Sequence, residues 1–236
     1  MPELHGLHVW GEFACFTRPE MKVERFSYPV ITPSAARGIL EAVYAKPAEF
    51  RWQVVRVEVL RPPAYIALRR NEVKNKGRAD GVRKAMENEA AVLEPILADE
   101  DAEGAGRTQR QTMALKDVEY RIWAEIRPWP DCSVPVAALD AQFRRRAEAG
   151  KCFCQPYFGC REFPAYFEYV SCAERLLPPV PLDMEIGWMM YDVFDLSNPG
   201  HCKSQPSVSL FWASVKQGVM VVPAYESPEV RKPGRG

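Results

Sequence analysis

Three basic residues, Arg18, Lys22 and Arg25, share a short segment with aromatic residues. The aromatic residues are Phe16, Phe26 and Tyr28. Sites for single-stranded nucleic acid combine positive side chains, which neutralise phosphates, with aromatic rings, which stack on bases. The segment therefore offers the chemistry of such a site, although a solvated surface loop often has the same composition.

Other basic residues form similar groups along the chain. Arg144, Arg145 and Arg146 are consecutive in a predicted helix, so their side chains fan across roughly 200° and at most two can face one ligand. Arg161 lies close to Gly159, where backbone amides can approach a phosphate; the alternative is a β-bulge with Arg161 in a structural ion pair. The candidates for binding a polyanion in these groups are Arg69, Arg70, Lys74, Arg107, Arg110, Arg144, Arg145 and Arg161.

The sequence predicts no metal, no cofactor and no disulfide. It holds seven cysteines and three histidines, and no two cysteines have the CxxC spacing of a zinc site. Cys152 and Cys154 would face the same side of a strand, but buried free thiols in a reducing cytosol are the simpler interpretation. The chain also lacks a phosphate-binding loop and a dinucleotide fingerprint, which argues against a small-molecule enzyme.

The composition is that of a globular protein without an overall electric field. Hydrophobic residues make up 47%, and 31 basic residues balance 31 acidic ones, so any nucleic-acid surface must come from segregated charge. The sequence has no basic N-terminal segment that leads into an apolar run, and no apolar stretch of roughly 18 residues. We therefore expect a cytoplasmic protein with no membrane contact.

Residues 32–47 read as a helix with clear ends. Thr32 is a good N-cap, Pro33 suits the first helical position, and Pro47 stops the helix. Apolar residues recur at helical spacing, and we place Arg37 on the solvent face. Tyr44 falls at the boundary, where its ring can pack inside and its hydroxyl can reach water.

The remaining pattern predicts an α+β fold. Strands at 4–16, 52–60, 113–126 and 161–170, with helices at 32–46 and 137–150, form the repeated strand–helix–strand order of a ferredoxin-like unit. A further short strand is expected at 65–69, and a charged insertion at 73–106 with a helix around 82–97. Strands at 187–194, 208–215 and 219–222 suggest a smaller antiparallel region. We thus divide the chain into 1–175, 176–225 and a loosely ordered tail at 226–236.

The apolar residues of these last strands are expected to form core or subunit contacts rather than base-stacking platforms. They are Trp188, Met189, Met190, Phe211 and Trp212.

Several blocks of this sequence occur in the order found in one family. The chain closely resembles the CRISPR-associated RAMP protein of the type I-C interference complex, which is the fifth Cas family in its Dvulg subtype. The blocks are Trp10–Tyr28, Thr32–Pro47, Arg69–Val73, Gln109-Arg110, Leu115–Tyr120, Phe143–Gly150 and Gly159–Ala165. They span nearly the whole chain.

The resemblance implies a ferredoxin-like RAMP domain that binds the 5′ handle of CRISPR RNA in a Cascade antiviral complex. Its partners would be the backbone and large subunits and, indirectly, target DNA. It also implies an endoribonuclease that cuts precursor repeat RNA without a metal. In that reading Tyr44 matches the family's catalytic tyrosine, in an orienting or proton-donating role, because the pKa of a tyrosine lies near 10.

The family's Lys-His pair before the arginine-rich helix is missing, since Ala138 and Leu139 stand at those positions. Either Tyr44 works with another cation, Lys46 or Lys151, or the protein is a non-catalytic capping subunit that binds the RNA.

Overall fold

The computed structural model describes residues 3–73, 79–88, 106–171, 176–200 and 206–234. The predicted RNA-binding residue Lys74 and one of the three histidines, His201, lie outside these ranges. The chain forms two compact units, Met1–Ile66 with Met113–Gly236, and Ala67–Thr112. No helix in the described ranges has the length and apolar character needed to cross a membrane.

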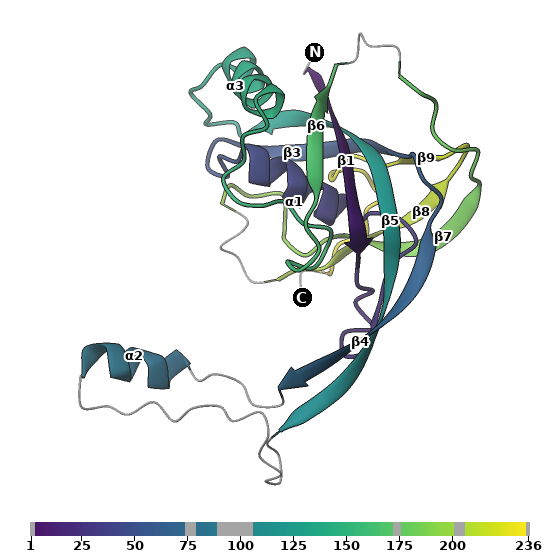
Figure 1. The fold of residues 1–236 in the computed structure, drawn as a ribbon. Coiled ribbons are helices and arrows are strands. Elements are labelled where there is room, and N and C mark those ends of the chain that lie inside the picture. The colour runs from purple at the N-terminus through teal and green to yellow at the C-terminus, as the bar shows by residue number, and fades with distance from the viewer. Residues whose placement is uncertain (1–2, 74–78, 89–105, 172–175, 201–205, 235–236) are drawn as a thin grey trace. The chain divides into compact units, whose positions relative to one another are not determined.

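The first unit is built on one antiparallel sheet (Figure 1). Its strands are ordered β6 (Tyr166–Val170), β1 (Leu4–Ala14), β5 (Arg107–Pro128), β3 (Phe50–Val59) and β9 (Val219–Val221). Short β2 (Arg25–Phe26) also pairs with β5. The order β6-β1-β5-β3 places the fourth long strand of this unit beside the first, as a ferredoxin-like split unit requires. The predicted α+β fold is therefore confirmed.

Two helices form a layer over this sheet. Helix α1 (Pro33–Val43) contacts β3, α3 (Val136–Glu148) contacts β6, and the two helices contact each other. Leu7 and Val9 on β1 lie opposite Ile122 and Tyr120 on β5, and all four side chains are buried. Burying each such side chain stabilises the fold by about 2 kcal/mol, which holds α1 and α3 in place.

A second, two-stranded sheet consists of β7 (Met184–Asp192) and β8 (Ser209–Val215). Met189 and Phe211 are buried, as expected of core residues, whereas Trp188 and Trp212 are a cross-strand pair on the exposed face. The expectation that 219–222 joins this small region was wrong, because β9 pairs with β3 of the large sheet. That pairing depends on long-range contacts, so the partner of a three-residue strand cannot be predicted from its own sequence.

The tail is packed rather than loosely ordered. Tyr225 and Val230 are buried, and Arg231 exchanges two backbone hydrogen bonds with Leu210 of β8 at 2.8 and 2.9 Å. The expectation of a loose tail was wrong for the described residues 226–234, because buried Val230 and the backbone pairing of Arg231 with Leu210 anchor the segment.

The second unit, described by itself, contains most of β4 (Ala64–Val73), α2 (Ala79–Glu87) and the beginning of β5, with which β4 pairs. β4 is longer than the predicted strand at 65–69. α2 buries none of its residues, and Arg110 forms an ion pair with Glu72 at 2.9 Å. Most of the predicted helix at 82–97 lies outside the described residues.

Candidate active site

Helix α1 ends immediately before the candidate catalytic residue, Tyr44. Thr32 caps the helix, since its hydroxyl oxygen accepts a hydrogen bond from the Ala35 amide at 3.2 Å. The helix ends at Val43, three residues earlier than expected, and Tyr44 continues as extended backbone with φ −152°. The Tyr44 amide still donates to the Leu40 carbonyl at 2.9 Å. The cap and the early end thus determine where Tyr44 leaves the helix.

Tyr44 is buried rather than half-exposed. Only 4% of the residue is accessible, its ring packs on Phe50 at 5.3 Å, and its carbonyl oxygen accepts from the Trp52 indole at 2.9 Å. Burial raises the pKa of the Tyr44 phenol above its ordinary value of about 10. Lys46 and Arg146 lower it in part, and Glu49 raises it. The phenol therefore carries its proton at neutral pH.

Two cations lie close enough to influence that phenol. Lys46 follows Tyr44 by two residues and forms an ion pair with Glu49 at 2.9 Å, which raises the lysine's pKa. Arg146 comes from α3, and its Nε donates to the carbonyl oxygen of Val43 at 2.6 Å. One cation is local in sequence, whereas the other is brought in by the packing of the helices.

The segment after α3 reinforces this arrangement. The Phe153 amide donates to the Ala42 carbonyl at 2.7 Å, and the Arg146 guanidinium lies 4.0 Å from the centre of the Phe153 ring. Lys151, the other predicted cation, is exposed, and its amide donates to the Arg146 carbonyl at 2.9 Å. Lys151 therefore belongs to the segment that docks beside the end of α1.

Arg146 is the residue that the sequence analysis missed when it chose Arg144 and Arg145. Arg146 follows buried Phe143 by three residues, so helical spacing already places it toward the body of the protein. Arg144 instead pairs with Glu3, and Arg145, which is exposed, contacts the side chain of Gln142.

The two described histidines each contact a carboxylate. His5 is fully buried, and its Nε2 lies 2.8 Å from Asp140 Oδ1, between the rings of Trp52 and Phe143. His8 Nε2 lies 2.9 Å from Glu119 Oε1. At the positions of the expected Lys-His pair, Leu139 is buried and Ala138 is exposed.

The loop with Arg18, Lys22 and Arg25 lies against the turn that carries Arg161. Arg25 contacts Glu162 at 3.4 Å, and the Cys15 amide donates to the Phe158 carbonyl at 3.0 Å. Arg18 lies 4.5 Å from the centre of the Tyr28 ring, while Lys22 and Arg161 are exposed. The structure thus brings these four candidates to neighbouring segments. The strand expected at 161–170 begins only at Tyr166, so Arg161 lies in a turn.

Gly159 permits this close approach. Its φ is +80°, and a Cβ at this position would lie 2.1 Å from the Cys15 carbonyl oxygen. Beside it, a cavity of about 380 Å³ separates the turn from α1 and is bordered by Thr17, Gly38, Glu41 and Tyr157. The predicted loop and turn therefore frame a hollow on the α1 side.

Arg37 does not lie on the solvent face as expected. It is buried, and its Nε and Nη2 donate to Asp192 at 2.8 and 3.1 Å. Burial alone would lower the pKa of Arg37, but the carboxylates of Asp192 and Glu41 outweigh it and raise the pKa. This buried ion pair fixes α1 to β7.

In the second unit, Arg69 and Arg107 are exposed on β4 and β5, and Arg70 is partly exposed. Arg110 is paired with Glu72. Among the described residues, the cysteines at 15, 132, 152, 154 and 160 form no disulfide.

The fold and the site thus describe a ferredoxin-like α+β protein with basic loops and a buried tyrosine whose pKa is lowered in part by two cations, Lys46 and Arg146. The family model described as CRISPR-associated protein (Cas_Cas5) matches residues 6–222. The chain belongs to this Cas5 family, and the resemblance of its motifs is confirmed.

Two relatives are similar over almost their full length. The CRISPR pre-crRNA endoribonuclease Cas5d of Mannheimia succiniciproducens is 40% identical over 234 residues, which cover 96% of this chain and 97% of the relative. The protein of the same name from Thermus thermophilus is also 40% identical, over 94% and 92% of the two chains. The crystal structure of a CRISPR-associated protein, 21% identical, superposes with a TM-score of 0.65 over 98% of this chain and 97% of that one, which supports the fold.

Proposed function

We propose that this protein is an endoribonuclease that cuts precursor CRISPR RNA within its repeat without a metal. After cleavage it stays on the 5′ handle as a cytoplasmic subunit of a type I-C Cascade complex. The observation that carries the proposal is the burial of Tyr44 beside two cations: Lys46 follows it by two residues, and Arg146 binds the carbonyl of the preceding residue, Val43. The 40% identity to two proteins named as pre-crRNA endoribonucleases supports the same activity.

The chemistry of RNA cleavage fits these side chains. The 2′-hydroxyl gives up its proton to water as its oxygen attacks the phosphorus, and negative charge grows on the phosphorane oxygens. The bond from phosphorus to the 5′-oxygen then breaks, and that oxygen leaves with a proton. Arg146 and Lys46 can stabilise the developing charge, and the protonated Tyr44 phenol can orient the phosphate or donate the proton. Lys151 is a further cation on the segment that follows Arg146.

The handle would be held by the basic loops. Arg18, Lys22, Arg25 and Arg161 supply phosphate contacts beside the cavity that reaches α1. Arg69, Arg70, Lys74, Arg107 and Arg110 are a second predicted group, within residues 67–112, and Arg145 on α3 is a third, whereas Arg144 is already paired with Glu3. The binding role of each group stays a prediction.

A cleavage assay tests the proposal. The purified protein is incubated with its own repeat hairpin in EDTA, and product is followed over time for wild type, Tyr44→Phe and, as a matched control, Tyr166→Phe. We expect cutting by wild type and by Tyr166→Phe, and a large loss for Tyr44→Phe. Retained cutting by Tyr44→Phe would remove Tyr44 from the mechanism.

The absence of the Lys-His pair favours a second candidate, a capping subunit that binds RNA without cutting it. Leu139 is buried and Ala138 has no functional group, so neither can replace the missing pair. Tight binding of the hairpin with no product in EDTA would select this candidate. No binding even at low salt, where phosphate contacts are strongest, would contradict both.

A further inference from the structure

β6 forms one edge of the large sheet. Within the described residues it pairs with β1 alone, from Tyr166 opposite Trp10 to Val170 opposite Gly6. An edge strand of this kind can accept an additional extended segment through backbone hydrogen bonds. Alternate side chains of that segment then contact pockets on opposite faces of the sheet. Both faces beside β6 are hollowed.

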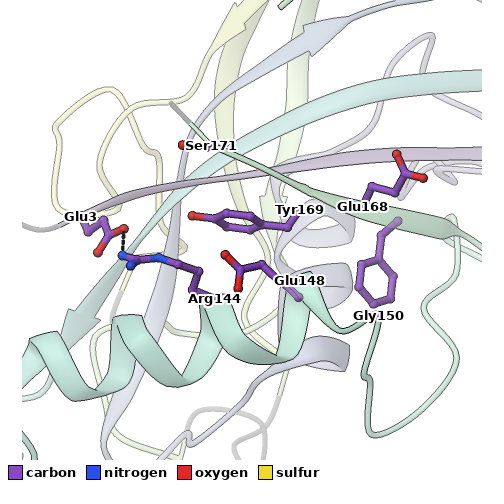
Figure 2. Close-up of a pocket in the computed structure, with 9 residues that line it drawn as sticks. Glu3, Arg144, Glu148, Gly150, Glu168, Tyr169 and Ser171 are labelled. Carbon is purple, nitrogen blue, oxygen red and sulfur yellow. Dashed lines mark hydrogen bonds and ion pairs between the residues drawn. The ribbon is translucent and has the colours of Figure 1, made fainter. Parts of the chain in front are cut away.

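The face toward α3 carries a cavity of about 580 Å³ (Figure 2). Phe167 and Tyr169 of β6 line it on one side, and Glu148 and Arg144 of α3 on the other. Arg144 already pairs with Glu3 and is hydrogen-bonded to Tyr169. The positive charge in this cavity is therefore already paired, and Glu148, which is exposed, adds negative charge to it.

The opposite face carries a second cavity, of about 370 Å³. Tyr166 stacks on Trp10 at 6.1 Å, and 54% of Tyr166 is exposed. The carboxylates around these rings belong to Glu12, Asp117 and Glu119. Arg61 lies 3.2 Å from Glu119, and His8 lies 2.9 Å from Glu119 and 4.0 Å from Glu168, so Arg61 is already paired and the His8 ring already contacts carboxylates.

We propose that β6 is a docking edge for an extended, basic segment of a partner protein. The segment adds a strand to the sheet, and its lysine or arginine side chains alternate between the two cavities. On one face they meet Glu148; on the other they meet carboxylates and the exposed rings of Trp10 and Tyr166, which attract cations. RNA is disfavoured on this edge, because phosphates would face the same carboxylates.

A blocked peptide, Thr-Lys-Lys-Val-Lys-Lys-Thr, probes this surface on the full-length protein. We expect saturable binding, protection of the amides of 166–170 from hydrogen exchange, and no binding of the peptide with glutamate in place of lysine. A version with every internal backbone nitrogen methylated keeps the charges but has no amide hydrogen to donate to a neighbouring strand on either of its edges. Equal binding of the methylated and unmethylated peptides, or no change in exchange at 166–170, would overturn the proposal.

Charge reversal provides the matched test. Glu148→Lys lies at the C-terminal end of α3, where a cation is compatible with the helix dipole, so the fold should be retained. Combined with Glu168→Lys it should weaken lysine-peptide binding by at least about tenfold. Glu229→Lys, an exposed reversal in the tail, should leave binding unchanged. If the double variant binds as tightly as Glu229→Lys, the acidic cavities do not hold the segment. Cleavage of repeat RNA is a separate readout, so failure here is distinguishable from failure of the proposed function.

Discussion

The Nε of Arg146 donates a hydrogen bond to the carbonyl oxygen of Val43, 2.6 Å away, and thereby joins the end of α3 to the end of α1. The last carbonyl groups of a helix have no partner inside the helix, so they need one elsewhere. Arg146 and the Phe153 amide supply partners for Val43 and Ala42. The contact that closes α1 therefore also brings a cation to Tyr44.

Arg146 should matter for cleavage beyond its charge. Arg146→Gln removes the cation, and we expect the cleavage rate at saturating RNA to fall about 10²-fold, as when one electrostatic donor is lost. Arg146→Lys keeps the charge but not the planar guanidinium, so it should recover only part of the rate. Arg61→Gln, an exposed arginine on the opposite face of the sheet, is the control and should cut normally. Equal rates for Arg146→Gln and Arg61→Gln would contradict the assignment.

The pKa of Tyr44 predicts a specific pH profile. Burial raises this pKa, so the phenol keeps its proton through pH 9 and cleavage should not decline for that reason below about pH 10. Tyr44→Phe should lower the rate by about 10² to 10⁴, the usual range for a lost general acid. The check is a rate profile of wild type and Tyr44→Phe from pH 6 to pH 10. A decline between pH 7 and 9 that is present in wild type and absent in Tyr44→Phe would show that the pKa is not raised.

Features of the fold that depend on neighbouring residues can be predicted from the sequence, whereas features that depend on long-range packing cannot. Thr32 and Pro33 define the start of α1 through their own backbone chemistry, so this boundary is readable directly. Arg37 looks solvent-facing by helical spacing, yet it is buried because Asp192, 155 residues away, neutralises it. No local pattern contains that partner.

The same distinction applies to the residues of the candidate site. Tyr44 and Lys46 are only two residues apart in sequence and could be named together, whereas Arg146 required knowledge of which face of α3 meets α1. Its spacing from buried Phe143 carried that signal, but the run of three arginines concealed it. His5 is the opposite example. A motif search would consider this histidine for catalysis, but its contact with buried Asp140 gives it a structural role.

The Arg37–Asp192 pair should be costly to break on one side. Asp192→Asn leaves the buried guanidinium of Arg37 without its main counter-charge, and we expect a loss of about 3–5 kcal/mol in the free energy of unfolding. Glu41→Gln removes the more exposed partner of the same arginine and should cost about 1 kcal/mol or less. Urea unfolding at pH 7 measures both.

The double replacement Arg37→Met with Asp192→Leu separates the pair from its burial. Because it removes both charges together, it should recover most of the stability lost in Asp192→Asn. Similar losses for Asp192→Asn and Glu41→Gln would show that the arginine is solvated.

Gly159 should be indispensable for the contact between the basic loop and the turn that carries Arg161. An alanine there must adopt φ +80° and place its Cβ 2.1 Å from the Cys15 carbonyl oxygen, so Gly159→Ala must displace one of the two segments. We expect a loss of stability of several kcal/mol in urea unfolding and weaker binding of repeat RNA at low salt. Gly38→Ala is the matched control, because Gly38 lies inside α1 with open space where its Cβ would stand, and it should stabilise the helix by up to about 1 kcal/mol. If Gly159→Ala is as stable as wild type, the loop and the turn do not approach each other as closely as Cys15 and Gly159 indicate.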